Sequence, residues 1–502
     1  MPEHIRALFV ITFLATVGFS LSKKLASQNV SNSSFNQWRN VWLAVVITAF
    51  IAHNFWIFIA ISSLVIIVLT KQEKNKMALF FILLFALPPI GKDIPGFGIV
   101  NYLFTVDYIR FIQLIVLLPA AFVISKKNNF TFTKIWADKF LLIYMLLMLI
   151  LEFRGKTFTD TLRTFFYLIL EILLPYYVAS RGVKSLSELN CVLQAFVTSA
   201  AVAACISAFE SVKHWLLFNE LPNALGANFD LGAYLGRGDG IRAVGALGHP
   251  IILGYFSAVG IGFYLYLSST IQKKSLKNIG FLLLTVGLLT PLSRGPWVGA
   301  LALLVIFILQ GHMAFKKLSR LFLVGIVIFT LLTLTPKGQK FIDLIPFYGK
   351  TEKYNVDYRE QLFNNSLIVI DRNPIFGSID YLKTPEMLEM TQGEGIIDIV
   401  NSYLAITLER GYVGLFLFLS IFVSVILGVR KSMKSITDKK SQLHVLGRSF
   451  VAIIIATMIT IASASSIASL PVIYWSILGL GVAYTQIVKR ADLNSTTNSS
   501  RP

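Results

Sequence analysis

Residues 411–429 read GYVGLFLFLSIFVSVILGV, and Arg430 and Lys431 follow directly. The stretch carries no charged side chain, and a helix of about 20 apolar residues is long enough to cross the hydrocarbon core of a membrane. Apolar helices that end in lysine and arginine usually end on the cytoplasmic side. This stretch therefore predicts a transmembrane helix whose C-terminal end faces the cytoplasm.

The composition extends this interpretation to the whole chain. Of its 502 residues, 55% are apolar and 14% are charged, whereas a soluble domain carries roughly 25% charged residues. These proportions exclude a soluble enzyme, a disordered chain and a nucleic-acid-binding domain. The apolar runs predict an all-α polytopic membrane bundle of about 14 transmembrane helices. The predicted spans are 5–22, 41–53, 55–70, 78–91, 108–125, 138–152, 162–179, 190–210, 249–269, 279–293, 296–310, 318–335, 411–429, 448–466 and 468–488, where 41–70 is either one tilted helix or two short ones.

The excess of positive charge has a topological explanation. The chain has 45 Lys and Arg against 26 Asp and Glu, which gives a net charge of +19. The basic clusters between spans all fall on one side when the spans are counted from residue 71 onward, and this side is then the cytoplasmic one. The clusters are Lys71, Lys74 and Lys76; Lys126 and Lys127; Arg181 and Lys184; Lys273, Lys274 and Lys277; Lys316, Lys317 and Arg320; Arg430, Lys431, Lys434, Lys439 and Lys440; and Lys489 and Arg490.

The same topology divides the chain into six segments. They are 1–210 (N-terminal transmembrane helices), 211–248 (first outer loop), 249–335 (central transmembrane helices), 336–410 (large outer loop), 411–490 (C-terminal transmembrane helices) and 491–502 (cytoplasmic tail). Loops longer than about 15 residues are uncommon unless they are functional or disordered. Apolar residues at near-helical spacing within 357–372 predict that the large loop is a small, partly helical cap on the outer face.

Motifs for nucleotides, cofactors and metals are absent from the sequence, which has no Walker A motif, no GxGxxG and no HExxH. Cys191 and Cys205 fall in one predicted span. A helix separates them by roughly 21 Å at a rise of 1.5 Å per residue, which is too far for a disulfide. We therefore expect no metal, no cofactor and no structural disulfide.

Polar motifs instead gather in the outer loops, and their order is informative. Arg242 precedes Gly248-His249-Pro250 at a span start, and Ser293-Arg294-Gly295 forms a turn between two spans. A helix led by Arg359 ends in Asn373-Pro374-Ile375-Phe376-Gly377. Then come Asn401-Ser402-Tyr403-Leu404 and Glu409-Arg410-Gly411-Tyr412-Val413-Gly414-Leu415. Over roughly 235–430, this ordered set resembles the O-antigen ligase and O-antigen polymerase superfamily of bacterial envelopes.

The resemblance implies a fold, a reaction and a location. Members of this superfamily are inner-membrane proteins that transfer a glycan from a polyprenyl diphosphate carrier to an acceptor at the periplasmic face. Ligases use a lipid A core acceptor, and polymerases use another carrier-linked repeat unit. The implied partners are a polyprenyl diphosphate-linked oligosaccharide in the lipid bilayer and, as proteins, a chain-length regulator or a flippase. No nucleic acid is implied, and the C-terminus is expected in the cytoplasm.

The leaving group of such a transfer is a lipid diphosphate, which suits arginine. A guanidinium stays protonated and offers forked donors to phosphate oxygens. Arg242, Arg294 and Arg359 are the candidates, and we assign Arg294 a catalytic role because it sits in the tight turn between two spans. The alternative is an ordinary ion pair, which is strongest for Arg359 between Asp357 and Glu360.

The acceptor hydroxyl needs a general base. Family ligases are expected to carry a histidine just before the Asn-x-Tyr-Leu segment, but Val400 stands there. Glu394 and Asp398 are the candidate bases, although Asp398 is equally suited to cap the following helix. His249, Asn401 and Tyr403 are the further candidates for substrate binding. The alternative for His249 is that it is an inert residue at the entry of a helix.

The missing histidine favours polymerisation of a surface polysaccharide, with inversion at the anomeric centre, over ligation to lipid A core. A lipid-linked glycan transporter or flippase would instead carry several charges at mid-membrane depth. Only Glu171 fits that expectation, with Arg163 as a possible partner and Pro175 as a possible kink. A sensory membrane protein would need a soluble output domain, which these residues do not show.

Overall fold

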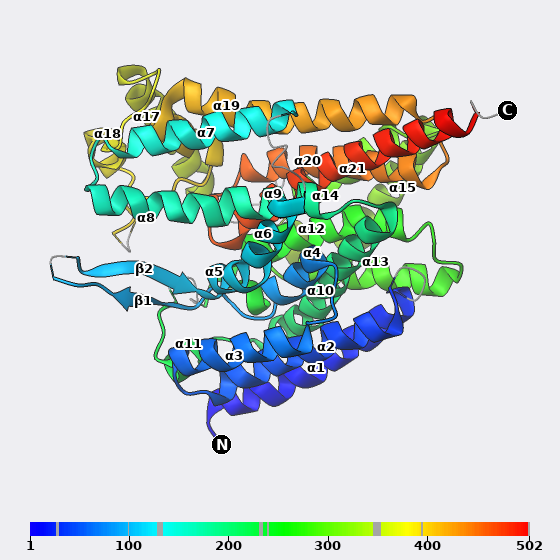
Figure 1. Ribbon diagram of the computed structural model, residues 1–502, viewed down its shortest axis with the longest axis horizontal. Coiled ribbons are helices and arrows are strands. Elements are labelled where there is room, and N and C mark those ends of the chain that lie inside the picture. Colours follow the sequence, from blue (N-terminus) through cyan, green and yellow to red (C-terminus); the bar gives the residue numbers. More distant parts are fainter. Residues whose placement is uncertain are drawn as a thin grey trace.

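The computed structural model describes residues 1–26, 30–98, 100–127, 134–229, 234–237, 240–344, 353–392 and 395–499. The chain forms a bundle of long helices that run roughly parallel and antiparallel to one another (Figure 1). The first half contains α1 (Glu3–Ala26), α2 (Asn32–Ile51), α3 (Phe55–Leu69), α4 (Lys76–Leu84), α5 (Tyr108–Ile112), α6 (Leu118–Lys127), α7 (Trp136–Glu152), α8 (Phe158–Leu168), α9 (Leu174–Gly182) and α10 (Leu186–Lys213).

The second half continues the bundle and adds short outer helices. It contains α11 (Leu221–Leu225), α12 (Pro250–Leu267), α13 (Lys274–Leu289), α14 (Arg294–Leu309), α15 (Ala314–Thr333), α16 (Pro336–Ile342), α17 (Lys353–Arg372), α18 (Pro385–Leu388), α19 (Ser402–Ser435), α20 (Gln442–Ile461) and α21 (Ser469–Ser499). The 3-10 turns are η3 (Gly245–Leu247) and η4 (Tyr381–Lys383). The predicted all-α class is thus confirmed.

Four helices form the centre of the bundle. Most residues of α10, α12, α20 and α21 are buried, whereas α1 and α19 expose one face. Small residues let the central helices approach closely. A Cβ built on Gly479 of α21, for example, would lie 2.5 Å from the Tyr176 carbonyl oxygen of α9. Any larger side chain there would push the two helices apart.

Two π-helical turns face each other inside the bundle. They are η1 (Gln113–Leu117) between α5 and α6, and η2 (Ile169–Leu173) between α8 and α9. The buried Gln113 Nε2 donates to the Leu170 carbonyl at 2.9 Å. π-Helical turns of this kind are frequent near functional sites.

Among the described residues, eight helices are long and apolar enough to cross a membrane. They are Glu3–Ala26, Tyr108–Lys126, Phe158–Gly182, Leu186–Lys213, Pro250–Leu267, Ser402–Ser435, Gln442–Ile461 and Ser469–Ala491, with Phe55–Leu69 and Arg294–Leu309 as shorter apolar helices. A multi-pass membrane protein is therefore supported, while the total of about 14 spans stays a prediction.

Three predicted span boundaries differ from the structure for local reasons. The predicted span 41–53 belongs to α2, which begins at Asn32 because the Ser31 hydroxyl caps it. The predicted span 78–91 ends early, since α4 stops at Leu84 ahead of two prolines, which cannot continue a helix. The predicted loop 336–410 also ends earlier than expected, because α19 begins at Ser402.

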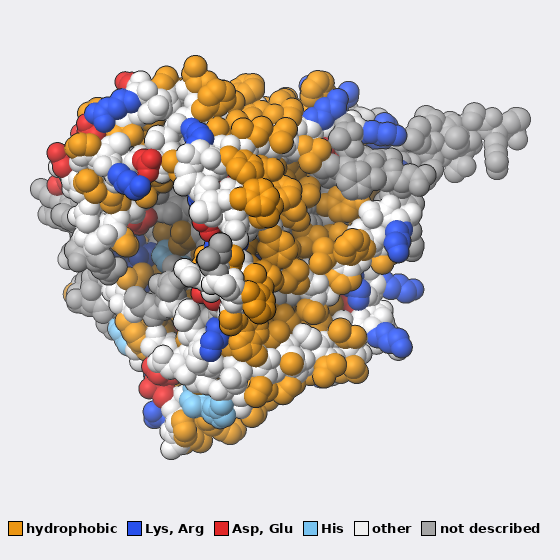
Figure 2. Space-filling view, turned by 60° about the vertical axis from the view of Figure 1, so that its left-hand side comes forward, with side chains coloured by type: hydrophobic (Ala, Val, Ile, Leu, Met, Phe, Trp, Pro, Cys, Tyr) orange, Lys and Arg blue, Asp and Glu red, His pale blue; other side chains and the backbone are white. Residues whose placement is uncertain are grey.

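The structure also contains two small antiparallel sheets, which the sequence did not predict. One pairs β1 (Gly91–Pro95) with β2 (Tyr102–Asp107), and the other pairs β3 (Gly236–Arg237) with β4 (Gly240–Ile241). The β1–β2 hairpin projects beyond the helices on the same side as α17 and α18 (Figure 1). Figure 2 shows a broad apolar band between this end, where both signs of charge occur, and an opposite end rich in Lys and Arg.

Candidate active site

A strained turn at residues 290–293 joins α13 to α14 at the outer end. Leu292 has a φ of 49°, which is uncommon for a non-glycine residue and is found at functional sites. Arg237 donates to the Leu292 carbonyl oxygen. Arg242 donates to the Pro291 carbonyl at 3.2 Å and to the Ser293 hydroxyl at 2.9 Å. Two arginines from the β3–β4 hairpin therefore fix the turn that leads into Arg294.

A buried carboxylate positions this hairpin. Glu210, near the end of α10, is 0% exposed. Its Oε2 accepts hydrogen bonds from the backbone N–H groups of Val244 at 3.0 Å and Gly245 at 2.8 Å, and its Oε1 accepts from Leu217 N at 3.1 Å. Because buried polar groups must be satisfied, this arrangement ties both ends of the first outer loop to α10.

His249 lies directly before α12 and caps it. Its Nδ1 accepts from the Ile251 N–H at 3.2 Å, so the neutral ring carries its proton on Nε2. Burial and the positive charge of Arg242 lower the pKa of His249 to about 4. At neutral pH the imidazole is therefore a hydrogen-bond donor, and its Nδ1 lone pair is already used. The helix-entry role is therefore confirmed, and it is compatible with a donor role for Nε2–H.

Arg294 is the first residue of α14. Its Nε donates to the Leu344 carbonyl at 2.9 Å and its Nη2 to the Asp343 carbonyl at 3.4 Å. The next residue, Gly295, packs on the other side against Ser463, whose hydroxyl would lie 2.5 Å from an added Cβ. Arg294 therefore stands between the first part of the large loop and the turn that follows α20.

Asp398 meets the same turn from its other side. Its Oδ1 accepts from the Ser465 hydroxyl at 2.9 Å, and its backbone carbonyl accepts from the Tyr358 hydroxyl of α17 at 3.1 Å. Asp398 does not cap the following helix, so that alternative is wrong. The serine-rich turn 462–468 thus connects the segment of Arg294 to the segment of Asp398.

The remaining predicted residues have mixed outcomes. Asn401 caps α19, since its side chain accepts from the backbone N–H groups of Tyr403 and Leu404. The Tyr403 hydroxyl donates to the Met458 carbonyl at 2.8 Å. Arg359 lies exposed on α17. Glu394 lies outside the described residues.

The two glycine motifs dock onto each other and anchor the large loop. α19 is broken at Gly411, where φ is 66° and ψ is −172°, a combination that essentially only glycine adopts. The loop Asn373–Gly377 enters this break, and Pro374 and Ile375 carbonyls accept from Tyr412 N at 2.8 Å and Val413 N at 3.2 Å. The motifs therefore shape the backbone that holds the cap.

Arg154, from the turn between α7 and α8, locks the docked motifs together. Its guanidinium donates to the carbonyls of Phe376 at 3.1 Å, Gly377 at 2.8 Å and Glu409 at 3.0 Å. One side chain therefore joins the loop motif to the helix motif.

A polar cavity of about 400 Å³ lies close to Gly248. Its lining combines carboxylates, hydroxyls, an amide, a guanidinium and two aromatic rings; the polar and aromatic members are Asp93, Tyr102, Thr105, Asp107, Arg110, Asn228 and Phe229. A Cβ on Gly248 would lie 3.0 Å from Phe229 and from Pro89, which also lines the cavity. The cavity is thus one residue away from His249.

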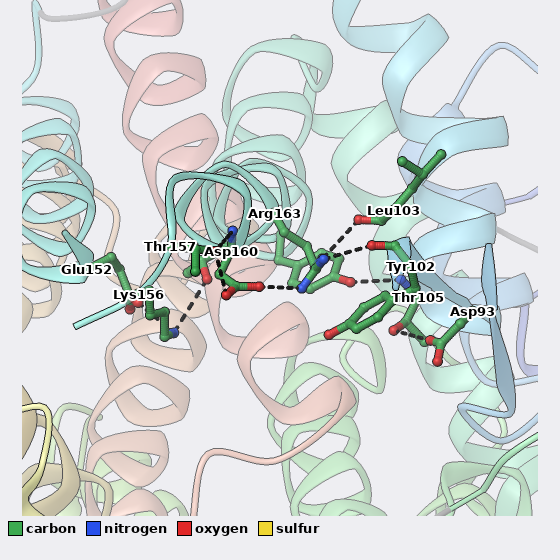
Figure 3. A network of polar contacts seen from close by, with 11 residues as sticks. Asp93, Tyr102, Leu103, Thr105, Glu152, Lys156, Thr157, Asp160 and Arg163 are labelled. Carbon is green, nitrogen blue, oxygen red and sulfur yellow. Dashed lines mark hydrogen bonds and ion pairs between the residues drawn. The ribbon is translucent and has the colours of Figure 1, made fainter. Parts of the chain in front are cut away.

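The hairpin wall of this cavity is held by α8 (Figure 3). Arg163 donates to the carbonyls of Leu103 at 2.9 Å and Tyr102 at 2.7 Å and pairs with Asp160 at 2.7 Å. Glu171 pairs with Arg110 at 2.8 Å, so the expected pairing with Arg163 is wrong.

Residues 279–419 match the family model described as O-antigen ligase. The match runs from α13 into the first part of α19 and contains Arg294, Arg359 and Asp398, while Arg242 and His249 precede it. It supports membership of the O-antigen ligase and polymerase superfamily, as the sequence resemblance predicted. No curated protein matches the chain.

Sequence reasoning missed several residues of this site. Arg237 stands in the same glycine-rich stretch as Arg242, and that proximity was a usable signal. Glu210 and Arg154 act through contacts far away in sequence, which no local pattern marks. Ser463 and Ser465 fall inside the predicted span 448–466, so the sequence placed them in the membrane.

Proposed function

We propose, from the O-antigen ligase match and the arginine-lined turn, that this protein is a glycan polymerase that uses a polyprenyl diphosphate-linked donor. An enzyme of the O-antigen ligase and polymerase type acting on a lipid-linked glycan in the membrane is already supported by the match. The observation that carries the finer proposal is that Arg237 and Arg242 hold the turn that leads directly into Arg294. Three guanidinium groups there suit a leaving diphosphate.

The proposed reaction is a direct displacement at the outer face. The donor diphosphate lies at Arg294 and Arg242, whose fixed positive charge stabilises the negative charge that develops as the glycosidic bond breaks. Asp398 or Glu394 takes the proton from the acceptor hydroxyl, and the new bond forms with inversion. The polar cavity near Gly248 receives a sugar of the glycan, because its carboxylate, amide and aromatic groups match hydroxyls and ring faces.

Two alternative functions are ligation to another acceptor and transport of a lipid-linked glycan. Ligation to lipid A core or another acceptor uses the same donor site, and the absence of a histidine at Val400 favours polymerisation over it. A transporter or flippase loses its main supporting observation, since Glu171 is paired with Arg110. Its charge is therefore balanced within the described part of the bundle.

The central experiment replaces Arg294. We expect Arg294→Ala to abolish surface polymer while the protein still reaches the membrane, with Arg294→Lys only partly active because lysine lacks the fork. Arg372→Gln is the matched control, since this outer-loop arginine is paired with Glu386. Wild-type chain lengths in Arg294→Ala would exclude Arg294 as a catalytic residue.

The base and the acceptor need separate tests. Glu394→Gln and Asp398→Asn, compared side by side, identify the base by which of them loses polymer; full activity in both would exclude a carboxylate base. Gel analysis of a deletion strain then distinguishes the two reactions. Single-repeat surface glycan indicates a lost polymerase, whereas full-length polymer held on the carrier indicates a lost ligase and contradicts the proposal.

A further inference from the structure

A second cavity lies at the basic end of the bundle, remote from the arginine-lined turn. Its volume is about 880 Å³, within the range of small-molecule sites. It is formed by the start of α7, the end of α9 and the late turns of α19 and α21. Six of its lining side chains are basic, and none is acidic: Lys134, Arg181, Lys184, Lys431, Lys489 and Arg490.

Such a concentration of like charge is unfavourable without an anion. Asp138 is 0% exposed and forms an ion pair with Arg181 while accepting from the Tyr176 hydroxyl at 2.7 Å, and the Glu188 carboxylate accepts from the Lys184 backbone N–H at 2.7 Å. Lys134, Lys431 and Lys489 form no ion pair with any residue that the structure describes. The charges of these three lysines are therefore not balanced by any carboxylate among the described residues.

Membrane topology alone does not account for this arrangement. The positive-inside rule places basic residues in loops on one side, where they can spread and avoid one another. Here bases from four helices line one cavity, and Arg490 donates to the Lys184 carbonyl at 3.1 Å, which joins α21 to the end of α9. The helices thus hold the charges together.

The surroundings of the cavity indicate what occupies it. Trp136 lines it and is 68% exposed, and tryptophan is enriched at the membrane–water interface. From there α7 and α19 run side by side along the top of Figure 1 and present outward apolar side chains, including Ile143 and Leu146 on α7 and Leu427 on α19. A ligand with a phosphate head and acyl chains fits both surfaces.

We propose that this basic cavity binds the phosphate headgroup of an anionic membrane lipid, with the acyl chains lying along α7 and α19. Basic pockets between transmembrane helices are known to bind such headgroups. A headgroup with two phosphates, as in cardiolipin, offers an anionic group to more than one of these cations. The site is independent of the proposed polymerase reaction at the other end.

The test uses the purified full-length protein in detergent and cardiolipin as the probe, with binding measured by native mass spectrometry and by titration. The double variant Lys431→Gln/Lys489→Gln should bind cardiolipin about 10- to 30-fold more weakly, since each lysine near an anionic lipid contributes about three- to fivefold. Lys273→Gln/Lys274→Gln removes the same charge from another basic cluster and should bind as the wild type does.

Three outcomes would overturn the proposal. Equal losses in both double variants would show general attraction between a basic protein and an anionic lipid. Equal binding of cardiolipin and phosphatidylcholine would show that the phosphates are not recognised. Binding of inorganic pyrophosphate that depends on Lys431 and Lys489, without such dependence for cardiolipin, would assign the cavity to a soluble anion.

Discussion

Replacing Gly411 by alanine tests whether the break in α19 anchors the outer cap. A Cβ there would lie 2.2 Å from the Ile375 carbonyl oxygen and 2.5 Å from Phe376 N, and these backbone atoms cannot rotate away. Separation of the two segments would lose the hydrogen bonds from Tyr412 N and Val413 N, worth about 1 kcal/mol each. The glycine-only backbone angles add roughly 1–3 kcal/mol of strain.

The expected total is about 3–5 kcal/mol, and it falls on the docking of the loop, which can detach locally while the bundle stays folded. The assays are limited proteolysis of the loop in detergent and polymer formation in cells. In Gly411→Ala, cleavage of the loop should become much faster and polymer formation should fall strongly. Gly377→Ala should act in the same way, because its Cβ would lie 2.5 Å from the Leu408 carbonyl oxygen.

Two glycines serve as matched controls. Gly226 has a φ of 58° with no atom within 4 Å of an added Cβ, so Gly226→Ala measures backbone strain without a collision. Gly325 in α15 has the same open space and no positive φ, so Gly325→Ala should be neutral or slightly stabilising. If Gly411→Ala resembled Gly226→Ala in proteolysis and polymer length, the docking argument would be refuted.

Three further predictions concern single side chains. Arg154→Gln removes most of a three-carbonyl clamp, so protease cleavage of the large loop should rise about tenfold at about 1.4 kcal/mol lost, with Arg154→Lys in between. Glu210→Gln keeps the shape but turns an amide N–H₂ toward a backbone N–H, which should cost about 1–3 kcal/mol and lower polymer yield at normal membrane abundance. His249→Asn keeps an N-cap acceptor but removes a titration. Because the folded pKa of His249 is lowered to about 4, its contribution to stability is complete above pH about 6.5 and is lost as the pH falls toward 4. The thermal unfolding midpoint of His249→Asn should therefore fall less than that of the wild type between those pH values.

The sequence predicted the helical membrane class because apolar runs and basic loops report directly on burial and topology. It also identified the glycine motifs at 373–377 and 411–415, but it could not show that they contact each other. These glycines are required by the backbone of the fold. In a sequence, a residue kept for that reason looks the same as a residue that contacts the substrate. Asn401 illustrates the same point, since its side chain caps α19.

Other features depend on contacts that only the folded chain creates. Arg154 reaches carbonyls more than 200 positions away, and Glu210 anchors a loop some 30 residues later. Neither belongs to a motif, and both carry charge at a span end, which usually indicates snorkelling. The helix boundaries differed for the opposite reason, because capping by Ser31 and the prolines after α4 are local effects that outweigh hydropathy.

The arginines differ in the kind of group that they contact. Arg110, Arg163 and Arg181 pair with carboxylates, so their charge is balanced where it stands. Carbonyl and hydroxyl oxygens, which carry no net charge, orient Arg242. Its positive charge is felt nearby, since it helps to lower the pKa of His249. A guanidinium that such bonds hold in place is oriented in advance for the proposed diphosphate, as catalysis by fixed charge requires.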